Sequence, residues 1–339
     1  MNIASGTYTG NGADDRPITG IGFTPVLVII VRSTGIWSWR SATMAGDVSL
    51  DMSGGDVLTD RIQSLDSDGF TVGTSGDVNA NLATYYYIAF AADTAILEYG
   101  SYTGDGIDGK LITTTLTPVF CLVQHGAGAG NTGVWRTSTI VGDNSFAINS
   151  ALGYAADRIQ TLAVGGFTVG GAATVNTLNE TYYYFILAAN STQISVGSYV
   201  GDNNDNRDIT TSPAIEPKLV WLKRHSTANN NTGAVRLPNP GGDSASKLGT
   251  GDLGDVIQAA NTNGFEVGTD YTANGNDGGG AGVNTYFYLT IAGVSVPATI
   301  PALPTLPGGA FSFMPFSPYQ RYKGIRMLTE ALRNARLGP

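Results

Sequence analysis

The chain has 339 residues, of which 42% are hydrophobic and only 13% are charged, and its formal net charge is −9. An acidic surface repels phosphate backbones, so we expect no nucleic-acid binding. The single cysteine, Cys121, excludes an internal disulfide framework and is expected to be a small core residue. The longest apolar run, residues 26–31, is far too short for membrane insertion, and the first ten residues lack the segments of a signal peptide.

One segment of 14 residues occurs three times along the chain. It reads DRIQSLDSDGFTVG at 60–73, DRIQTLAVGGFTVG at 157–170 and DVIQAANTNGFEVG at 255–268. Other motifs recur in the same order: GTYTG, GSYTG and GSYVG begin at Gly6, Gly100 and Gly197, and TYYYIAFAA, TYYYFILAA and TYFYLTIAG begin at Thr84, Thr181 and Thr285. A fixed motif order at a spacing close to 97 residues indicates a tandem triplication of one unit, and each unit is long enough to be a domain with its own core.

Each unit predicts an antiparallel β-fold. A buried strand follows Pro25, Pro118 and Pro217, and alternating strands are expected at GFTV and TYYYIAFA. Clusters of Gly, Asn and Asp mark turns every 8–15 residues. We therefore predict an all-β protein with three tandem, jelly-roll-like antiparallel β-sandwiches of about 97 residues, each with roughly seven or eight strands. The expected boundaries are 1–94, 95–192 and 193–294, followed by an extended Pro-rich arm and a short C-terminal helix at 295–339.

The repeated segment itself has a structural interpretation. Ile62, Leu65, Phe70 and Val72 are predicted to fill equivalent core positions in each copy, and Gly69 is predicted to occupy a turn that needs positive φ. The three-residue spacing of Ile62 and Leu65 favours one or two turns of helix over DRIQSL.

The last 45 residues have a different character. Pro297, Pro301, Pro304 and Pro307 predict an extended, partly polyproline-II arm. A helix is expected from Ser317 onward, and this end of the chain carries a net charge of +4 against −13 for the rest. The candidate assembly contacts are its apolar and basic side chains: Phe311, Phe313, Phe316, Tyr319, Arg326, Leu328, Leu332 and Arg333. We expect the arm to hold a homo-oligomer, with a trimer favoured, or to bind other virion proteins.

No pattern in the sequence predicts catalysis. Neither His125 nor His225 is repeated or has a partner at metal-ligand spacing, and hydrolase templates are missing. The stretch 202–208 begins like a calcium loop, but Arg207 and Pro213 stand where such a loop needs Gly and Glu. A looser calcium site among Asp and Asn turns stays open. We predict no catalytic residue, no bound metal and no cofactor.

The repeated unit, GxYxGN…SLDSDGFTVG…TYYYIAFAA, resembles a repeat found in phage-encoded structural proteins, often tail or appendage proteins. The first repeat matches best, through residues 20–32, 64–73 and 85–92, and the second and third depart from the SLDSDG pattern. The three units cover about 290 residues, and the arm lies outside the resemblance. The resemblance implies a non-enzymatic virion protein made in the host cytoplasm, and it carries over no catalytic residue.

One function and two alternatives follow as expectations. The first is a bacteriophage structural protein of the tail, baseplate or appendage. The alternative is a receptor- or glycan-binding adhesin module, with exposed Trp37, Trp39 and Trp135 stacking on sugars, or a capsid decoration protein. Burial of these tryptophans would favour the structural function.

Overall fold

The computed structural model describes residues 1–52, 54, 57–126, 132–148, 154–225, 233–237, 243–247, 251–275 and 284–293. The expected arm and terminal helix, 295–339, lie outside the described residues. Among the described residues, no helix is long and apolar enough to cross a membrane. The predicted all-β sandwich architecture is confirmed, and each repeat contributes nine strands within the described part of the chain.

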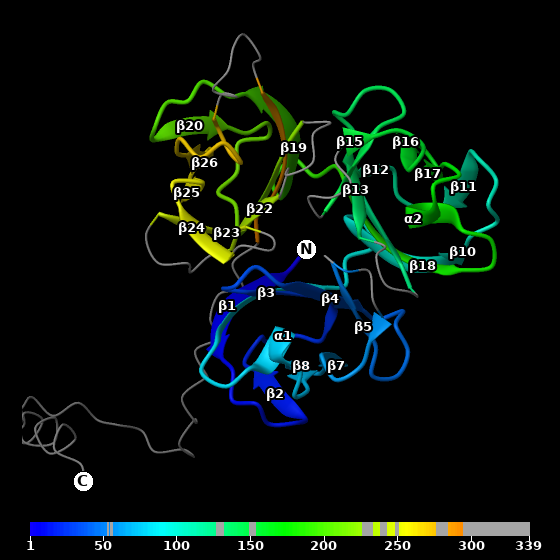
Figure 1. The fold of residues 1–339 in the computed structure, drawn as a ribbon, viewed down its shortest axis with the longest axis vertical. Coiled ribbons are helices and arrows are strands. Elements are labelled where there is room, and N and C mark those ends of the chain that lie inside the picture. Colours follow the sequence, from blue (N-terminus) through cyan, green and yellow to red (C-terminus); the bar gives the residue numbers. More distant parts are fainter. Residues whose placement is uncertain are drawn as a thin grey trace, which may run out of the picture. The chain divides into compact units, whose positions relative to one another are not determined.

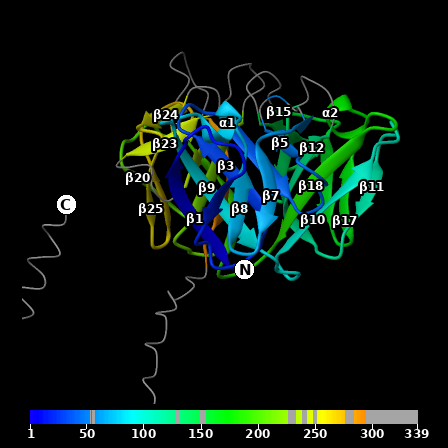
Figure 2. The same ribbon diagram turned by 90° about the horizontal axis from the view of Figure 1, so that it is seen from below.

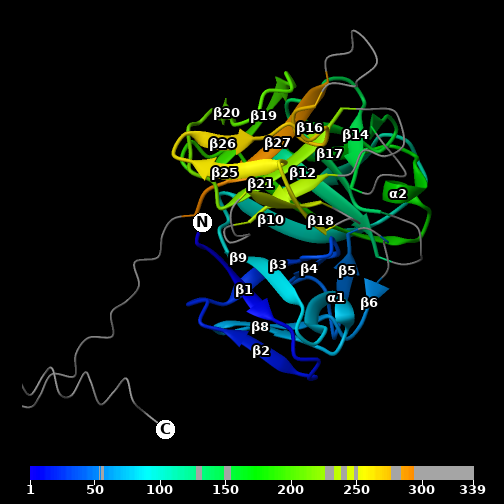
Figure 3. The same ribbon diagram turned by 60° about the vertical axis from the view of Figure 1, so that its left-hand side comes forward.

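The first repeat pairs a sheet of six strands, in the order β1-β9-β3-β4-β5-β6, with a sheet of three, β2-β8-β7. Its elements are β1 (Ile3–Thr9), β2 (Arg16–Thr19), β3 (Pro25–Arg32), β4 (Trp37–Ser41), β5 (Ser49–Asp51), β6 (Val57–Leu58), β7 (Ile62–Asp66), β8 (Gly69–Val72), α1 (Gly76–Asn79) and β9 (Thr84–Ala91). Figure 3 shows β2 and β8 as a layer of their own below β1, β3 and β9.

The other two repeats have the same sheet order, β10-β18-β12-β13-β14-β15 with β11-β17-β16, and β19-β27-β21-β22-β23-β24 with β20-β26-β25. The second contains β10 (Leu97–Thr103), β11 (Lys110–Thr113), β12 (Pro118–His125), β13 (Val134–Thr137), β14 (Ser145–Ala147), β15 (Tyr154–Ala155), β16 (Ile159–Ala163), β17 (Gly166–Val169), α2 (Ala173–Asn176) and β18 (Thr181–Ala188). The third contains β19 (Ile194–Val200), β20 (Arg207–Thr210), β21 (Leu219–Arg224), β22 (Ala234–Arg236), β23 (Ser244–Lys247), β24 (Gly251–Gly254), β25 (Ile257–Asn261), β26 (Gly264–Val267) and β27 (Thr285–Ile291).

The central strands of the six-stranded sheets are buried on both faces. On β3, Val28 and Ile30 point into the sandwich core of their own repeat, while Leu27, Ile29 and Val31 join a second core on the opposite face. A strand buried on both faces needs apolar side chains at successive positions. This explains why the strand after each repeated proline is continuously apolar instead of alternating.

That second core is common to the three repeats. One buried cluster contains residues of every repeat, among them Trp39, Phe120 and Leu289. Figure 1 shows the repeats as three lobes, coloured blue, green and yellow, with the six-stranded sheets turned toward a shared centre. In Figure 2, α1 and α2 lie at one end of this assembly and the N-terminus at the other. The repeats therefore have small cores of their own, but they are joined by a large one.

Residues 62–66 form strand β7, so the helix predicted over DRIQSL is wrong. In β7 the register shifts between Ile62 and Ser64, which leaves Gln63 as the extra residue of a β-bulge. The bulge breaks the alternation once, so that Ile62 and Leu65 both pack on the sandwich core. The same shift occurs in β16 and β25. The spacing of three residues thus comes from a bulge and not from a helical turn.

The predicted core position of the repeated phenylalanine is confirmed. Phe70, Phe167 and Phe265 are each fully buried in the sandwich core of their own repeat. Gly69 precedes Phe70 with φ +157°, and a Cβ there would lie 1.9 Å from the carbonyl oxygen of Ile18 on β2. The two neighbouring strands therefore approach too closely for any side chain at this glycine.

The two ends of the repeated segment touch each other. Asp60 has φ 64°, and its carboxylate accepts a hydrogen bond from the amide of Thr74 at 2.9 Å. A Cβ on Gly73 would lie 2.2 Å from that carboxylate. Asp157 and Asp255 have the same positive φ. In each copy, the aspartate carboxylate therefore occupies the space in which a side chain at the final glycine would lie.

Candidate functional sites

The sequence-predicted site residues fall into two groups in the structure. The assembly contacts, Phe311, Phe313, Phe316, Tyr319, Arg326, Leu328, Leu332 and Arg333, lie outside the described residues. The tryptophans proposed to stack on sugars are buried, since Trp37 is 1% exposed and Trp39 and Trp135 are 0% exposed. The expectation of exposed tryptophans is therefore wrong, because these indoles form part of the shared core.

Position by position, the tryptophans compensate for one another in that core. Trp39 lies opposite Ile29, and Trp135 lies opposite Leu122 in the second repeat. In the third repeat the order is reversed, with Trp221 on β21 opposite Val235 on β22. At this paired position each repeat thus has one indole and one aliphatic side chain, which keeps the packed volume similar.

The seam between the first and second repeats contains an amide. Trp39 packs edge-on against Phe185, with ring centroids 5.5 Å apart. Its indole Nε1 donates a hydrogen bond of 2.6 Å to Oε1 of Gln124. Nε2 of Gln124 donates in turn to the backbone carbonyl of Asp51. The buried polar atoms at this seam are thereby linked from one repeat to the other.

The seam between the second and third repeats contains an ammonium group at the equivalent position. Lys223 is fully buried, and its Nζ donates to the backbone carbonyls of Ala147 and Ile148, the latter at 2.9 Å. Burial lowers the pKa of Lys223 to about 7. The ring of Phe146 packs against Phe287 at 5.5 Å. A lysine here replaces the amide that joins the first two repeats.

The seam between the third and first repeats has an apolar residue, Val31, at that position. Its polar contacts come from elsewhere: the amide of Asp252 donates to the carbonyl of Ser33 at 2.8 Å, and Tyr86 Oη donates to Oδ2 of Asp252 at 2.9 Å. Burial raises the pKa of Asp252, and burial with this hydrogen bond raises the pKa of Tyr86 to about 12. Trp37 and Trp221 meet edge-to-face across this seam at 5.6 Å.

Gln193 connects the start and the end of the described ring. Its Nε2 donates to the carbonyl of Met1 at 2.7 Å and to that of Ala292 at 3.2 Å. The amino group of Met1 lies 2.8 Å from a carboxylate oxygen of Asp93. The three repeats therefore form a closed ring in which each contacts the other two.

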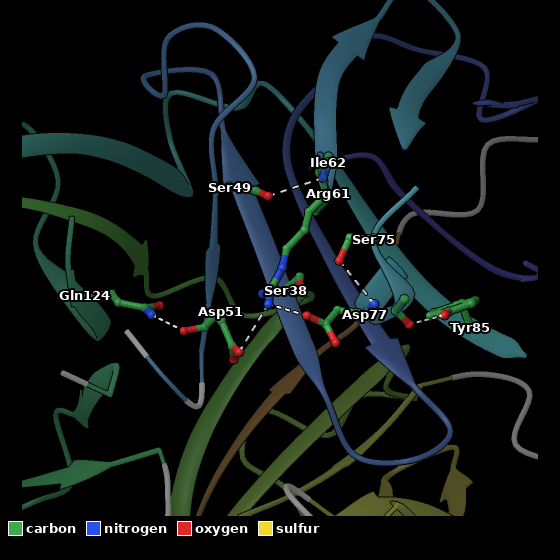
Figure 4. Close-up of polar contacts among 10 residues, drawn as sticks. Ser38, Ser49, Asp51, Arg61, Ile62, Ser75, Asp77, Tyr85 and Gln124 are labelled. Carbon is green, nitrogen blue, oxygen red and sulfur yellow. Dashed lines mark hydrogen bonds and ion pairs between the residues drawn. The ribbon is translucent and has the colours of Figure 1, made fainter. Parts of the chain in front are cut away.

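A buried arginine joins the repeated segment to the first seam. Arg61 forms ion pairs with Asp77 and with Asp51, the latter at 3.5 Å, and its Nη1 donates to Ser38 Oγ at 3.3 Å. Figure 4 shows Arg61 reaching past Ser38 toward both carboxylates, with Gln124 of the second repeat on the other side of Asp51. Arg61 thus acts as a structural cation between the sandwich core and the seam.

Sequence reasoning missed the role of two repeated polar residues. Arg40 donates from its guanidinium to the carbonyls of Met44 at 3.0 Å and Gly46 at 2.6 Å, and Arg136 and Arg236 occupy the same position. Asn79 is fully buried. Its Oδ1 accepts a hydrogen bond from the amide of Asn11, and its Nδ2 donates to the carbonyls of Ala13 and Gly73. The signal was present, since both residue types recur in all three copies.

The remaining ionisable candidates have structural surroundings. His125 packs on the ring of Tyr182 at 4.8 Å and His225 on that of Tyr154 at 4.2 Å, and burial lowers the pKa of both imidazoles. Burial also raises the pKa of the Cys121 thiol well above its usual value, and this side chain is fully buried as predicted. A thiol held in its neutral form is a poor nucleophile.

The acidic turn at 202–208 is held by its own residues. The carboxylate of Asp202 accepts from the amide of Asn204 at 3.0 Å and lies 3.3 Å from Nε of Arg207. Within the described ranges, no group of three or more His, Cys, Asp or Glu side chains is placed to hold a metal ion.

The third repeat has a hollow at its small sheet. A cavity of about 560 Å³ is lined by Asp208, Ile209, Thr210, Glu216 and residues 260–265. A second cavity of about 260 Å³ shares Glu216 and Ala260 with it.

Comparison with protein-family models and with curated proteins finds no match to this chain.

Proposed function

We propose that this chain is a non-enzymatic structural protein of a bacteriophage virion, a component of the tail, baseplate or appendage that assembles through residues 295–339. The observation that carries the proposal is the use of the repeated residues. Phe70 fills a core, Gly69 permits a close strand contact, and Arg40 and Asn79 tie loops to the sheets. Because the residues repeated in the three units serve packing, we infer that the chain is a rigid structural block.

Two further observations support the proposal. The resemblance of the repeats to those of phage structural proteins supports the virion role, and the segregation of charge, with net +4 after residue 293 and −13 before it, supports assembly through the arm. Opposite charges favour association of one copy's arm with the ring of another, or with a different acidic virion protein. We propose a homo-oligomer, with a trimer favoured.

The alternative function as a receptor- or glycan-binding module is no longer supported by exposed tryptophans. Sugar stacking needs an exposed aromatic face, and Trp37, Trp39 and Trp135 are buried. A capsid decoration protein stays an alternative, because a rigid ring with an adhesive arm would suit that position as well.

The proposal is tested in infected cells. Full-length chain and a chain ending at Gly293, both with the same tag, are supplied during infection, and purified particles are analysed by mass spectrometry and immunogold labelling. We expect the full-length chain in the particles, at the tail, and the shortened chain in the soluble fraction. Absence of the full-length chain from particles would contradict the virion role, and labelling over the head would favour capsid decoration.

A further inference from the structure

The two cavities of the third repeat follow one strand. Both are lined by residues of β25, and they meet at Glu216 and Ala260. The larger, at about 560 Å³, is within the range of about 300–1,000 Å³ found for ligand pockets. The two together form a groove along β25, which we call the β25 groove.

The groove exists because a leucine is missing. The residue paired with the core phenylalanine is Leu65 in β7 and Leu162 in β16, and each packs against the sandwich core of its repeat. The equivalent residue paired with Phe265 is Ala260, which is exposed. Replacing a partly buried Leu by Ala removes apolar volume at the edge of the core and leaves a hollow.

The walls of the groove have a definite chemistry. Ile209 and Phe265 lie along its inner side, Asp208 and Glu216 lie at the larger cavity, and Lys218 and Arg236 lie at the smaller one. In the described sheet, whose order is β20-β26-β25, strand β25 is outermost and has a strand neighbour on one side only. An extended peptide with apolar side chains can add to such an edge, with its main chain bonded to the strand.

One segment of this chain matches these walls. Residues 308–314, GGAFSFM, lie between Pro307 and Pro315 and contain no proline. Phe311 and Phe313 alternate, so in an extended peptide both point to the same side. The residues that follow carry the +4 charge of the arm, which complements Asp208 and Glu216 at the larger cavity.

The spacer before this segment sets how far the segment can reach. The last described residue, Gly293, lies against Lys218, and Lys218 lines the smaller cavity. Residues 294–307 contain four prolines, and an extended Pro-rich spacer of this length spans roughly 40 Å at about 3.1 Å per residue. A spacer of this length allows the segment 308–314 to reach the groove of a second copy.

We propose that residues 308–314 of one copy bind as an added strand in the β25 groove of a second copy, with Phe311 or Phe313 in the hollow beside Ala260. This proposal rests on the assembly role proposed above for the arm, and it assigns that role a receiving site. The donor and the acceptor are different surfaces, so the contact is head-to-tail.

The first test fills the hollow in the full-length chain. Ala260→Leu restores the side chain found in the other repeats, so the fold should be kept while the groove is closed. We expect self-association, measured by analytical ultracentrifugation, to weaken at least tenfold. The matched control is Ala163→Leu, which adds the same side chain at an exposed position of β16. Unchanged self-association of Ala260→Leu, with an unchanged melting temperature, would overturn the proposal.

A second test traps the contact with cysteines on separate chains. Full-length Asn261→Cys is mixed with full-length Ser312→Cys, and the mixture is mildly oxidised; the natural Cys121 is fully buried and contributes little background. We expect a covalent heterodimer on a non-reducing gel, and none with Ala163→Cys in place of Asn261→Cys. A cross-link that forms only within a doubly substituted chain, or no cross-link at all, would refute docking between copies.

The chain ending at Gly293 separates the two proposals. If it no longer self-associates while Ala260→Leu still does and no heterodimer forms, the arm is the assembly element but the β25 groove is not its site. If the shortened chain self-associates as the full-length chain does, the assembly role of the arm fails as well.

Discussion

Trp37→Ala tests whether the three repeats are one folding unit. Trp37 is 1% exposed and packs edge-to-face on Trp221 of the third repeat at 5.6 Å. Truncating a buried Trp to Ala costs about 3–5 kcal/mol, of which the aromatic pair accounts for about 0.5–1.5 kcal/mol. Since each kcal/mol shifts the melting temperature of a large domain by about 2 °C or more, we expect a decrease of at least about 6 °C.

The informative measurement is the loss of amide hydrogen-exchange protection in each of the three repeats. The central strands β9, β18 and β27 report separately on the three repeats in hydrogen exchange followed by mass spectrometry. Because the shared core contains residues of all three repeats, we expect all three strands to lose protection together and calorimetry to show one transition.

The control is Val164→Ala, since Val164 is 89% exposed and its truncation should leave both measurements unchanged. The stringent comparison is β18, whose repeat does not contain either ring of the Trp37–Trp221 pair. Full protection of β18 alongside loss in β9, or two separate thermal transitions, would show that the repeats unfold independently and that the shared core does not couple them.

Three other changes have defined outcomes. Gly69→Ala should destabilise the fold by more than about 1 kcal/mol in urea unfolding, because the new Cβ would lie 1.9 Å from the Ile18 carbonyl oxygen; a neutral result would mean that the strands can separate. Arg40→Met should cost about 1–3 kcal/mol for each carbonyl left without a donor, and Arg40→Lys should recover only part of it. The pKa of Lys223 is about 7 in the folded chain and returns to its ordinary, higher value on unfolding. Above pH 7 the unfolded chain therefore binds more protons than the folded chain. The free energy of unfolding should then rise from pH 7 to 9 by up to about 1.4 kcal/mol per pH unit. Lys223→Met should remove that rise, and an equal slope in both proteins would contradict it.

Much of the fold could be predicted because it depends on local patterns. The repetition, the turns and the strand at GFTV are visible as residue types and alternation, and burial of Phe70 follows from them. The segment DRIQSL was misassigned because a β-bulge produces the same three-residue spacing as a helical turn, and periodicity alone does not separate the two.

The common core has one signal in the sequence, the uninterrupted apolar strand after each repeated proline. An uninterrupted apolar strand such as β3 in an antiparallel sheet means that both faces are covered, and a sandwich of two sheets covers only one. The prediction of exposed tryptophans fails because a single sandwich leaves this face of the sheet open, whereas the shared core covers it. The β25 groove depends on the loss of one leucine, and its consequence at Ala260 becomes visible only when the repeats are compared in space.

The shared core also has a consequence for synthesis of the chain on the ribosome. The inner face of the first repeat, with Trp37, Trp39 and Leu27, is covered by residues of the second and third repeats. Translation at about 5–20 residues per second leaves roughly 10–40 s between completion of the first and the third repeat. During that interval the nascent chain presents an apolar sheet to the cytosol, so a chaperone that binds nascent chains is expected to engage the first repeat and to leave when the third repeat folds.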